Sequence, residues 1–196
     1  MAQRVNMIRS FFMSIRYALL GLLAKQPQTG YDLFHTFKTQ QIYYWSSTHS
    51  QVYKELGKME EEHLTTHDIV YQEGSPNKKV YTITPDGERH LIEWMIHTKS
   101  KPAKIKDEFL IKTSAFHVIS KEEAISLLQR MKAHNEMVVT GTGQWKEQMF
   151  QGNKPGYGQV GEYLTAEYGI RYAQMYVDWC DWAIKEIHSL PEDTES

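Results

Sequence analysis

The stretch from Trp45 to Pro85 constrains the fold of this chain more than any other part. It opens with Thr48-x-x-Gln51, the capping-box pattern, in which each of the two side chains accepts a hydrogen bond from the backbone N–H of the other residue. A β-strand, a Gly-Ser-Pro-Asn-Lys-Lys turn and a second strand follow. A short capped helix joined directly to a hairpin with a basic tip is typical of a winged helix-turn-helix. That architecture mostly binds DNA.

Three helices are expected before the hairpin. Apolar residues recur at helical spacing over residues 14–25, and Pro27 ends this first helix because the residue before a proline avoids the α conformation. Thr29 can cap a second helix over residues 30–39. The third helix begins near Thr48 and is polar on its outer face. Its predicted inner stripe is Val52, Leu56, Met59 and His63.

The hairpin strands are expected over residues 64–72 and 79–84, and a further helix begins with Thr84-Pro85. Helices are then expected over residues 107–119 and from Ser120 to about Thr140. The glycine-rich residues 141–161 predict a long connection or a broken helix. The fold class is therefore mainly α with a small β-hairpin wing. The predicted parts are an N-terminal extension (1–12), a winged helix-turn-helix DNA-binding domain (13–98), a linker (99–106) and a helical dimerisation and effector-response domain (107–196).

The final helix, over about residues 162–189, is apolar on two sides. One seam steps alternately by three and four residues, as in a coiled coil, and consists of Tyr163, Ala166, Ile170, Ala173, Val177, Cys180, Ile184 and Ile187. The second stripe consists of Leu164, Tyr168, Met175, Trp179 and Trp182. A helix of the same subunit can cover one side and a partner subunit the other, which predicts a homodimer. The alternative is a long core helix within a monomer.

Composition narrows the classes of function. The chain has 22 Lys and Arg against 24 Asp and Glu, a net charge of −2, which argues against a strongly cationic nucleic-acid coat but leaves room for a local basic patch. Cys180 is the single cysteine, so no intrachain disulfide can form and a cytoplasmic location is expected. No apolar run reaches the roughly 18 residues of a membrane span.

The sequence favours neither an enzyme nor a metal or cofactor site. It contains no nucleophile elbow, phosphate-binding loop or dinucleotide fingerprint. His63 and His67 have i, i+4 spacing, but they straddle a predicted helix end, and chance pairing among nine histidines explains them more simply.

The predicted DNA contacts lie mainly at the start of the third helix, because only the N-terminal part of a recognition helix usually enters the major groove. Gln51 can read adenine, or it can serve only the cap. Tyr31 can reach a phosphate or pack in the core. The acidic run at 60–62 is expected to be a solvated face turned away from DNA. The predicted contact residues are Tyr31, His49, Ser50, Gln51, Tyr53, Lys54 and the wing lysines Lys78 and Lys79.

These segments together resemble the PadR family of transcriptional regulators. The matching segments are Tyr17-Ala-Leu-Leu-Gly-Leu-Leu, Thr29-Gly-Tyr-Asp-Leu, Trp45-x-x-x-His-Ser-Gln-Val-Tyr-x-Glu-Leu and Lys79-x-Tyr-Thr-Ile-Thr-Pro-x-Gly. Lys106-Asp-Glu-Phe-Leu-Ile-Lys112 and Tyr172-x-x-x-Tyr-x-x-Trp-x-x-Trp are similar to the branch with a long C-terminal domain. The resemblance implies dimerisation through the C-terminal helices. It also implies repression of a phenolic acid decarboxylase gene, relieved by p-coumaric or ferulic acid.

Such an effector needs a pocket lined by aromatic side chains, and a cation or hydrogen-bond donor that binds its carboxylate. The candidates with suitable chemistry are Lys106, Tyr163, Tyr168, Arg171 and Tyr172. Arg171 interrupts the apolar surface of the last helix, and its alternative role is an ion pair with Glu167 or Glu108.

The leading hypothesis is a homodimeric repressor that binds a palindromic double-stranded operator and is released by a small aromatic acid. Within the same family, an activator or a multidrug-responsive repressor is the alternative. A winged-helix module that binds protein is the rival from another class. A steep fall of DNA affinity with salt would distinguish a DNA-binding protein from that module.

Overall fold

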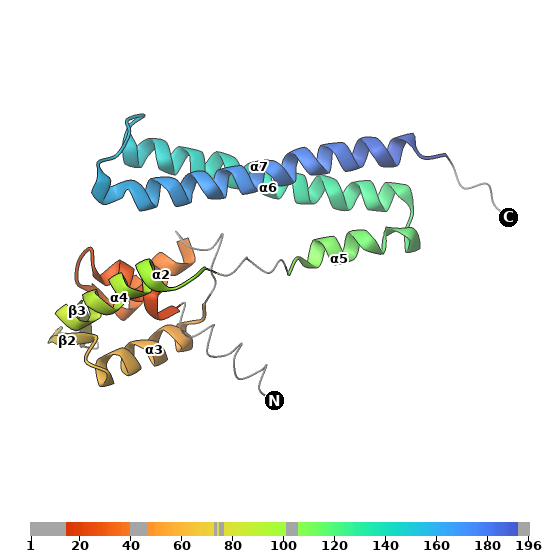
Figure 1. Cartoon of the computed structure of the whole chain (residues 1–196). Coiled ribbons are helices and arrows are strands. Elements are labelled where there is room, and N and C mark those ends of the chain that lie inside the picture. Colours follow the sequence, from red (N-terminus) through yellow and green to blue (C-terminus); the bar gives the residue numbers. More distant parts are fainter. Residues whose placement is uncertain (1–14, 40–46, 73, 75–76, 101–105, 192–196) are drawn as a thin grey trace. The chain divides into compact units, whose positions relative to one another are not determined.

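The computed structural model describes residues 15–39, 47–72, 74, 77–100 and 106–191 (Figure 1). The predicted extension over residues 1–12, the predicted Trp45 and residues 101–105 of the predicted linker lie outside this set. The chain divides into two compact units, residues 1–102 and 103–196. The division falls within the segment predicted to be a linker, and each unit has its own core.

The described residues of the N-terminal unit form four helices and a small sheet. Residues 15–23 are helical. The later elements are β1 (Gln28–Thr29), α2 (Gly30–Thr39), α3 (His49–Glu61), β2 (Thr65–Val70), β3 (Lys78–Ile83) and α4 (Pro85–His97). The sheet is antiparallel in the order β1-β3-β2. The expected helix, hairpin and helix between Thr48 and Pro85 are confirmed, whereas β1 was not expected, because two residues carry no periodicity.

The core of this unit is formed by the first three helices and the root of the hairpin. Ile15, Leu19, Leu33, Leu56 and Met59 are fully buried in it. The predicted inner stripe of α3 is thus confirmed as far as Met59. Including His63 was wrong: the helix ends at Glu61, and His63 is an exposed turn residue with φ of 59°.

The C-terminal unit is a long helical hairpin with a short helix beside it. Its elements are α5 (Glu108–Ser114), the 3-10 turn η1 (Phe116–Val118), α6 (Lys121–Phe150), the 3-10 turn η2 (Tyr157–Gln159) and α7 (Val160–Ser189). Figure 1 shows α6 and α7 side by side. The predicted helix over residues 107–119 is interrupted at Ala115, where a tighter turn begins.

The expected break after Thr140 is wrong, because α6 continues through Gly141 and Gly143 to Phe150. A glycine inside a helix costs about 1 kcal/mol relative to alanine. The buried residues of α6, Thr142 and Phe150 among them, show that this second half of the helix packs along α7. Tertiary packing offsets the glycine cost, and only the turn over residues 151–159 remains of the predicted connection.

The coiled-coil seam of α7 packs within its own chain. Ala173, Val177 and Cys180 are buried, and Cys180 shares a cluster with Leu128 of α6 and Phe109 of α5. Trp179, from the second stripe, packs edge-to-face on Phe109 at 6.2 Å between ring centroids. The rest of the second stripe stays exposed in the single chain. It consists of Leu164, Tyr168, Met175 and Trp182, which are between 49 and 59 % exposed.

Candidate nucleic-acid interface

The N-terminus of α3 is fixed by the predicted capping box. The Gln51 N–H donates to Thr48 Oγ1 at 3.3 Å, and the Thr48 N–H donates to Gln51 Oε1 at 2.8 Å. The structural role of Gln51 is therefore confirmed. It leaves the Nε2 donor of the same amide, and one lone pair of Oε1, outside the cap. Capping and adenine recognition are compatible, because they use different atoms or lone pairs of one side chain.

Two of the predicted contact residues also hold α2 against α3. The His49 ring lies 5.3 Å from Phe34 and 4.3 Å from Tyr53, centroid to centroid. The Tyr53 ring in turn passes over Gly30, where an added Cβ would lie 2.7 Å from the ring. An alanine at position 30 would therefore force the Tyr53 ring to move. His49 and Tyr53 are exposed, and each ring has an aromatic neighbour.

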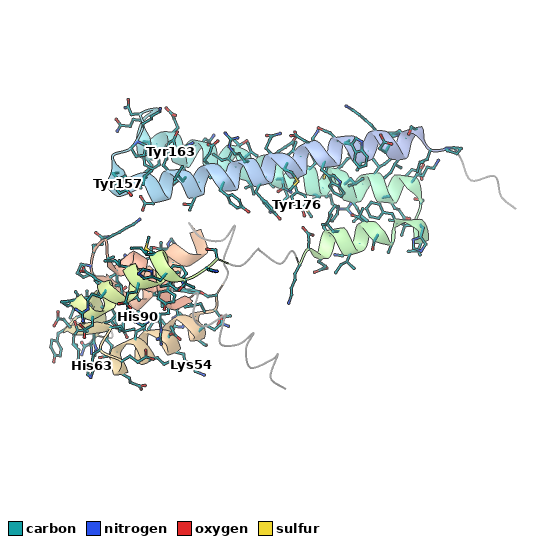
Figure 2. All side chains as sticks on the ribbon, in the orientation of Figure 1. Lys54, His63, His90, Tyr157, Tyr163 and Tyr176 are labelled. Atoms are coloured by element: carbon teal, nitrogen blue, oxygen red, sulfur yellow. The ribbon has the colours of Figure 1, made fainter. Side chains whose placement is uncertain are left out.

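Ser50 and Lys54 are exposed on the outer side of α3, and Figure 2 shows Lys54 pointing away from the core of its unit. Tyr31 is 64 % exposed and stacks on His35, so the alternative of a core position for Tyr31 is wrong. The structure therefore presents the predicted residues of α2 and α3 on the surface of one unit.

The wing carries Lys78 and Lys79 at the start of β3, opposite Val70 and Ile69 of β2. Both lysines are exposed. Gly74 has a φ of +74°, a conformation that favours glycine, and it allows the chain to reverse at the tip. The basic tip expected from the sequence is thus at the end of a regular antiparallel hairpin.

The acidic run at the end of α3 does not behave as a purely solvated face. Glu60 pairs with His67 of β2, and both oxygens of Glu62 accept from the guanidinium of Arg16, at 2.6 and 2.8 Å. Glu62 is exposed as predicted, whereas Glu60 is half-buried, so the prediction of a solvated face is wrong for Glu60 alone. The two ion pairs were not predicted, because the partners are distant in sequence. Among the described residues, Glu61 is exposed and is the member of the run that forms no ion pair.

Arg16 and Glu55 were not identified from the sequence. Arg16 Nε donates to Glu55 Oε1 at 2.8 Å, and Glu55 is buried. Burial alone would lower the pKa of Arg16, but the hydrogen bonds and charges of Glu62 and Glu55 outweigh it and raise that pKa. The available signal was a charged residue inside each of two apolar helical patterns.

The predicted effector residues do not form one cluster. Tyr168 and Tyr172 stack on each other at 6.2 Å, and Tyr172 contacts Tyr176, whose hydroxyl donates to Asp107. Figure 2 labels Tyr176 on α7, and Asp107 caps the start of α5. Burial, followed by the charge of Asp107, raises the pKa of Tyr172. Lys106 precedes Asp107 in the chain and is exposed.

Tyr163 and Arg171 have other partners. Tyr163 packs on Phe150 and lies under the ammonium of Lys146, which is 4.1 Å from the ring centroid. The Arg171 guanidinium pairs with Glu167 at 2.7 Å, which confirms the ion-pair alternative. Tyr176 contacts Tyr172 and donates to Asp107. Neither Tyr176 nor Asp107 was predicted from the sequence as an effector residue.

An open hollow of about 410 Å³ lies elsewhere, at the start of α6, and contains none of these residues. Its lining is Ile119, Glu122, Glu123, Ser126, Leu127 and Arg130. Within the described ranges, no three His, Cys, Asp or Glu side chains come together as a metal site. Among the described helices, none combines the length and apolar character that a bilayer span requires.

Two family models match the chain. "Transcriptional regulator PadR-like family" covers residues 19–93, and "Virulence activator alpha C-term" covers residues 105–188. The negative transcriptional regulator PadR of Bacillus subtilis is 30 % identical over 170 residues, which are 85 % of this chain and 93 % of that protein.

Solved structures agree with these matches. The crystal structure of Bacillus subtilis PadR in complex with operator DNA has a TM-score of 0.78 at 30 % identity and covers 89 % of this chain and 99 % of its own. The same protein in complex with p-coumaric acid has a TM-score of 0.72 at 28 % identity, with the same coverage. The Vibrio cholerae virulence activator AphA has a TM-score of 0.67 at 28 % identity, over 90 % of this chain and 99 % of its own.

Proposed function

This chain belongs to the PadR-like family of transcriptional regulators, and we propose that it is a repressor that binds a palindromic DNA operator as a homodimer. The observation that carries this is the exposed polar start of α3 in the same unit as a wing with a basic tip. The family consists of transcriptional regulators, so the chain is not an enzyme. As a DNA-bound regulator, it is proposed to act in the cytoplasm.

The proposed DNA contacts divide into two kinds. Ser50, Gln51 and Lys54 reach base edges in the major groove, with His49 and Tyr53 framing them. Tyr31 and the wing residues Lys78 and Lys79 contact phosphates, which fixes the orientation of the unit but reads no sequence. All of these residues are exposed except Gln51, which is half-buried, and this supports the assignment.

The exposed stripe on α7 supports the homodimer. Leu164, Tyr168, Met175 and Trp182 recur on one side of the helix, while the opposite seam is already covered by α6. A row of large apolar side chains in water is typical of a protein–protein interface. A second copy of the chain, with its own stripe, is the proposed partner, and a symmetric dimer matches a palindromic operator.

The proposed effector is a small aromatic acid such as p-coumaric or ferulic acid, and the proposed target is a phenolic acid decarboxylase gene. The Bacillus subtilis relative has been crystallised with p-coumaric acid, and this supports the class of ligand. Tyr168, Tyr172 and Lys106 supply stacking surface and a cation near Asp107. Arg171 is proposed to bind the carboxylate after exchanging its partner Glu167, and Tyr163 is proposed to flank the site.

An activator is the second candidate, since the C-terminal unit matches the virulence activator family over residues 105–188. The likeness to AphA, at 28 % identity, points the same way. The sign of regulation depends on where the operator lies relative to the promoter. A reporter gene behind the selected operator would therefore show a rise in expression for an activator and a fall for a repressor.

The test begins with selection of duplexes by the full chain from a random-sequence DNA library. A palindromic consensus is expected. Fluorescence anisotropy on that duplex should show tight binding that weakens steeply with salt and is lost on adding p-coumaric acid. Tight binding that is unchanged by p-coumaric acid would contradict the proposed effector but would still support DNA binding. Failure to enrich any sequence would favour a protein-binding module instead.

The substitution Gln51→Glu separates reading from capping at the start of α3. Glutamate supports the capping box as well as glutamine does, so the thermal stability should stay the same. It lacks the amide donor that adenine recognition needs, so binding to the selected duplex should weaken by about 1–3 kcal/mol. A scrambled duplex serves as the control, because a mere effect of the added charge would weaken both duplexes alike.

Replacing Lys78 and Lys79 together by alanine should weaken binding to the selected and the scrambled duplex alike. Each phosphate contact contributes about 0.9 to the slope of log affinity against log salt. A bound homodimer loses four lysines, two from each subunit, so the slope should fall by roughly 3.6. The change is read from anisotropy titrations at several salt concentrations. Lys185 of α7, which is exposed and lies in the other unit, provides the control: Lys185→Ala should leave the slope unchanged.

A further inference from the structure

Glu55 is a buried carboxylate in the middle of α3, only 1 % exposed. Its neighbours Val52 and Leu56 belong to the apolar core. Burying a carboxylate costs free energy unless it is paired with a cation and hydrogen-bonded. Arg16 Nε donates to its Oε1 at 2.8 Å, and the ammonium of Lys58 lies 3.8 Å from its Oε2.

The same guanidinium also holds the end of α3. Arg16 Nη1 and Nη2 donate to the two oxygens of Glu62, which caps the helix. Glu55 and Glu62 are seven residues apart, which places them on one side of the helix and about 10 Å apart along its axis. Arg16 therefore ties two points of α3 to one point of the helix over residues 15–23.

We propose that Arg16 is a positioning residue, which fixes the rotation of α3 about its own axis so that Ser50, Gln51 and Lys54 meet the DNA bases. This rests on the proposed function. A helix with its side chains has a radius of about 5–6 Å, so a roll of about 10° moves the outer atoms by roughly 1 Å. A hydrogen bond to a base edge does not survive a displacement of that size, since it weakens steeply beyond its usual length.

Arg16 does not itself contact the DNA in this proposal. Its side chain is 17 % exposed, and Nε, Nη1 and Nη2 all donate to carboxylates of α3. Three of its five N–H donors are engaged, and the charges of the two carboxylates offset that of the guanidinium, so its attraction for a phosphate is weak. Loss of Arg16 should therefore reduce sequence discrimination, rather than affinity for DNA in general.

The test uses the double variant Arg16→Met with Glu55→Leu in the full chain. It removes one positive and one negative charge, so the net charge stays the same. Apolar replacement of a buried ion pair is often neutral for stability, whereas loss of one partner alone is not. The readout is the ratio of affinities for the duplex selected by the wild-type chain and for its scrambled version. This ratio should fall about tenfold, as for the loss of one good base contact, with no fall in the melting temperature.

A second variant keeps the buried pair and breaks the other attachment. Glu62→Gln should lower the affinity ratio less than the double variant does, because Arg16 still holds Glu55. The matched control is Asp86→Asn with Arg89→Gln, which removes an exposed ion pair on α4 and should leave the ratio unchanged.

An unchanged ratio in both test variants would overturn the positioning role. A ratio that falls only together with the melting temperature would also overturn it, since the pair would then be a stability element. If the wild-type chain selects no duplex at all, the proposed function itself fails at that step, before any variant is compared.

Discussion

The double substitution Met175→Asp with Trp182→Asp is expected to convert the protein to a monomer of 23.0 kDa and to abolish tight operator binding. Both side chains belong to the exposed stripe of α7, and about half of each remains uncovered within its own chain. If a second copy covers them, the change places four carboxylates in an apolar interface. Buried charges without partners are costly, so the dimer should dissociate.

The loss of DNA affinity follows from geometry. A dimer places one α3 in each half of a palindrome, and the second half-site then binds at a high effective concentration. Separate subunits lose this gain, which is about 10²- to 10⁴-fold. Sedimentation velocity gives the mass, and anisotropy on the selected duplex gives the affinity.

The matched control for this prediction is Gln174→Asp with Lys185→Asn. Both positions are exposed and lie on α7 away from the stripe, and the pair changes the net charge by the same amount. This control should stay dimeric and keep its affinity. A dimer that survives the Met175 and Trp182 substitutions would place the interface elsewhere, and a monomeric wild-type chain would contradict the homodimer altogether.

The substitution Gly87→Ala is expected to destabilise the N-terminal unit by about 3 kcal/mol or more, the upper end of what overpacking costs. Gly87 is buried in the first turn of α4. A Cβ there would lie 2.2 Å from the carbonyl oxygen of Leu64 and 2.9 Å from Ile83 Cγ1. The backbone oxygen cannot rotate away as a side chain can, so α4 would have to move.

Movement of α4 would break further contacts at the same point. The Thr84 N–H donates to Leu64 O at 3.1 Å, and the Thr84 hydroxyl donates to His63 O at 2.7 Å. These bonds attach α4 to the turn between α3 and the wing. Thermal unfolding followed by circular dichroism should therefore show a midpoint lowered by more than about 10 °C for this unit.

Gly57→Ala is the control for that measurement. Gly57 lies inside α3, and nothing lies within 4 Å of where its Cβ would be. Alanine should raise the stability there by about 0.5–1 kcal/mol, because glycine is a poor helix former. A Gly87→Ala variant with the same unfolding midpoint as the wild-type chain would contradict the close contact between α4 and Leu64.

The parts of the fold that could be predicted depend on residues close together in sequence. The capping box at Thr48 and Gln51 spans three residues, and the hairpin strands are joined by one turn. Arg16 and Glu55, which form an ion pair, are 39 residues apart in sequence, and no local pattern predicts this contact. The continuation of α6 through Gly141 likewise depends on α7, which packs on it from a distant part of the chain.

The candidate site divides in the same way. The exposed residues at the start of α3 could be predicted, because helical spacing shows which side faces the core. The partners of Glu60 and Glu62 could not be predicted, because a run of acidic residues has the same sequence whether its side chains are solvated or form ion pairs. The pairing of Tyr176 with Asp107 was missed for a similar reason, because α5 and α7 are far apart in sequence.

The two sides of α3 can vary independently of each other. Val52, Leu56 and Met59 are fully buried, whereas Ser50 and Lys54 on the other side are exposed. A combinatorial library at positions 50 and 54 would therefore leave the core untouched. Position 51 should be limited to glutamine and glutamate, since the cap needs one or the other. Through this separation, new operator preferences are open to laboratory evolution without first stabilising the scaffold.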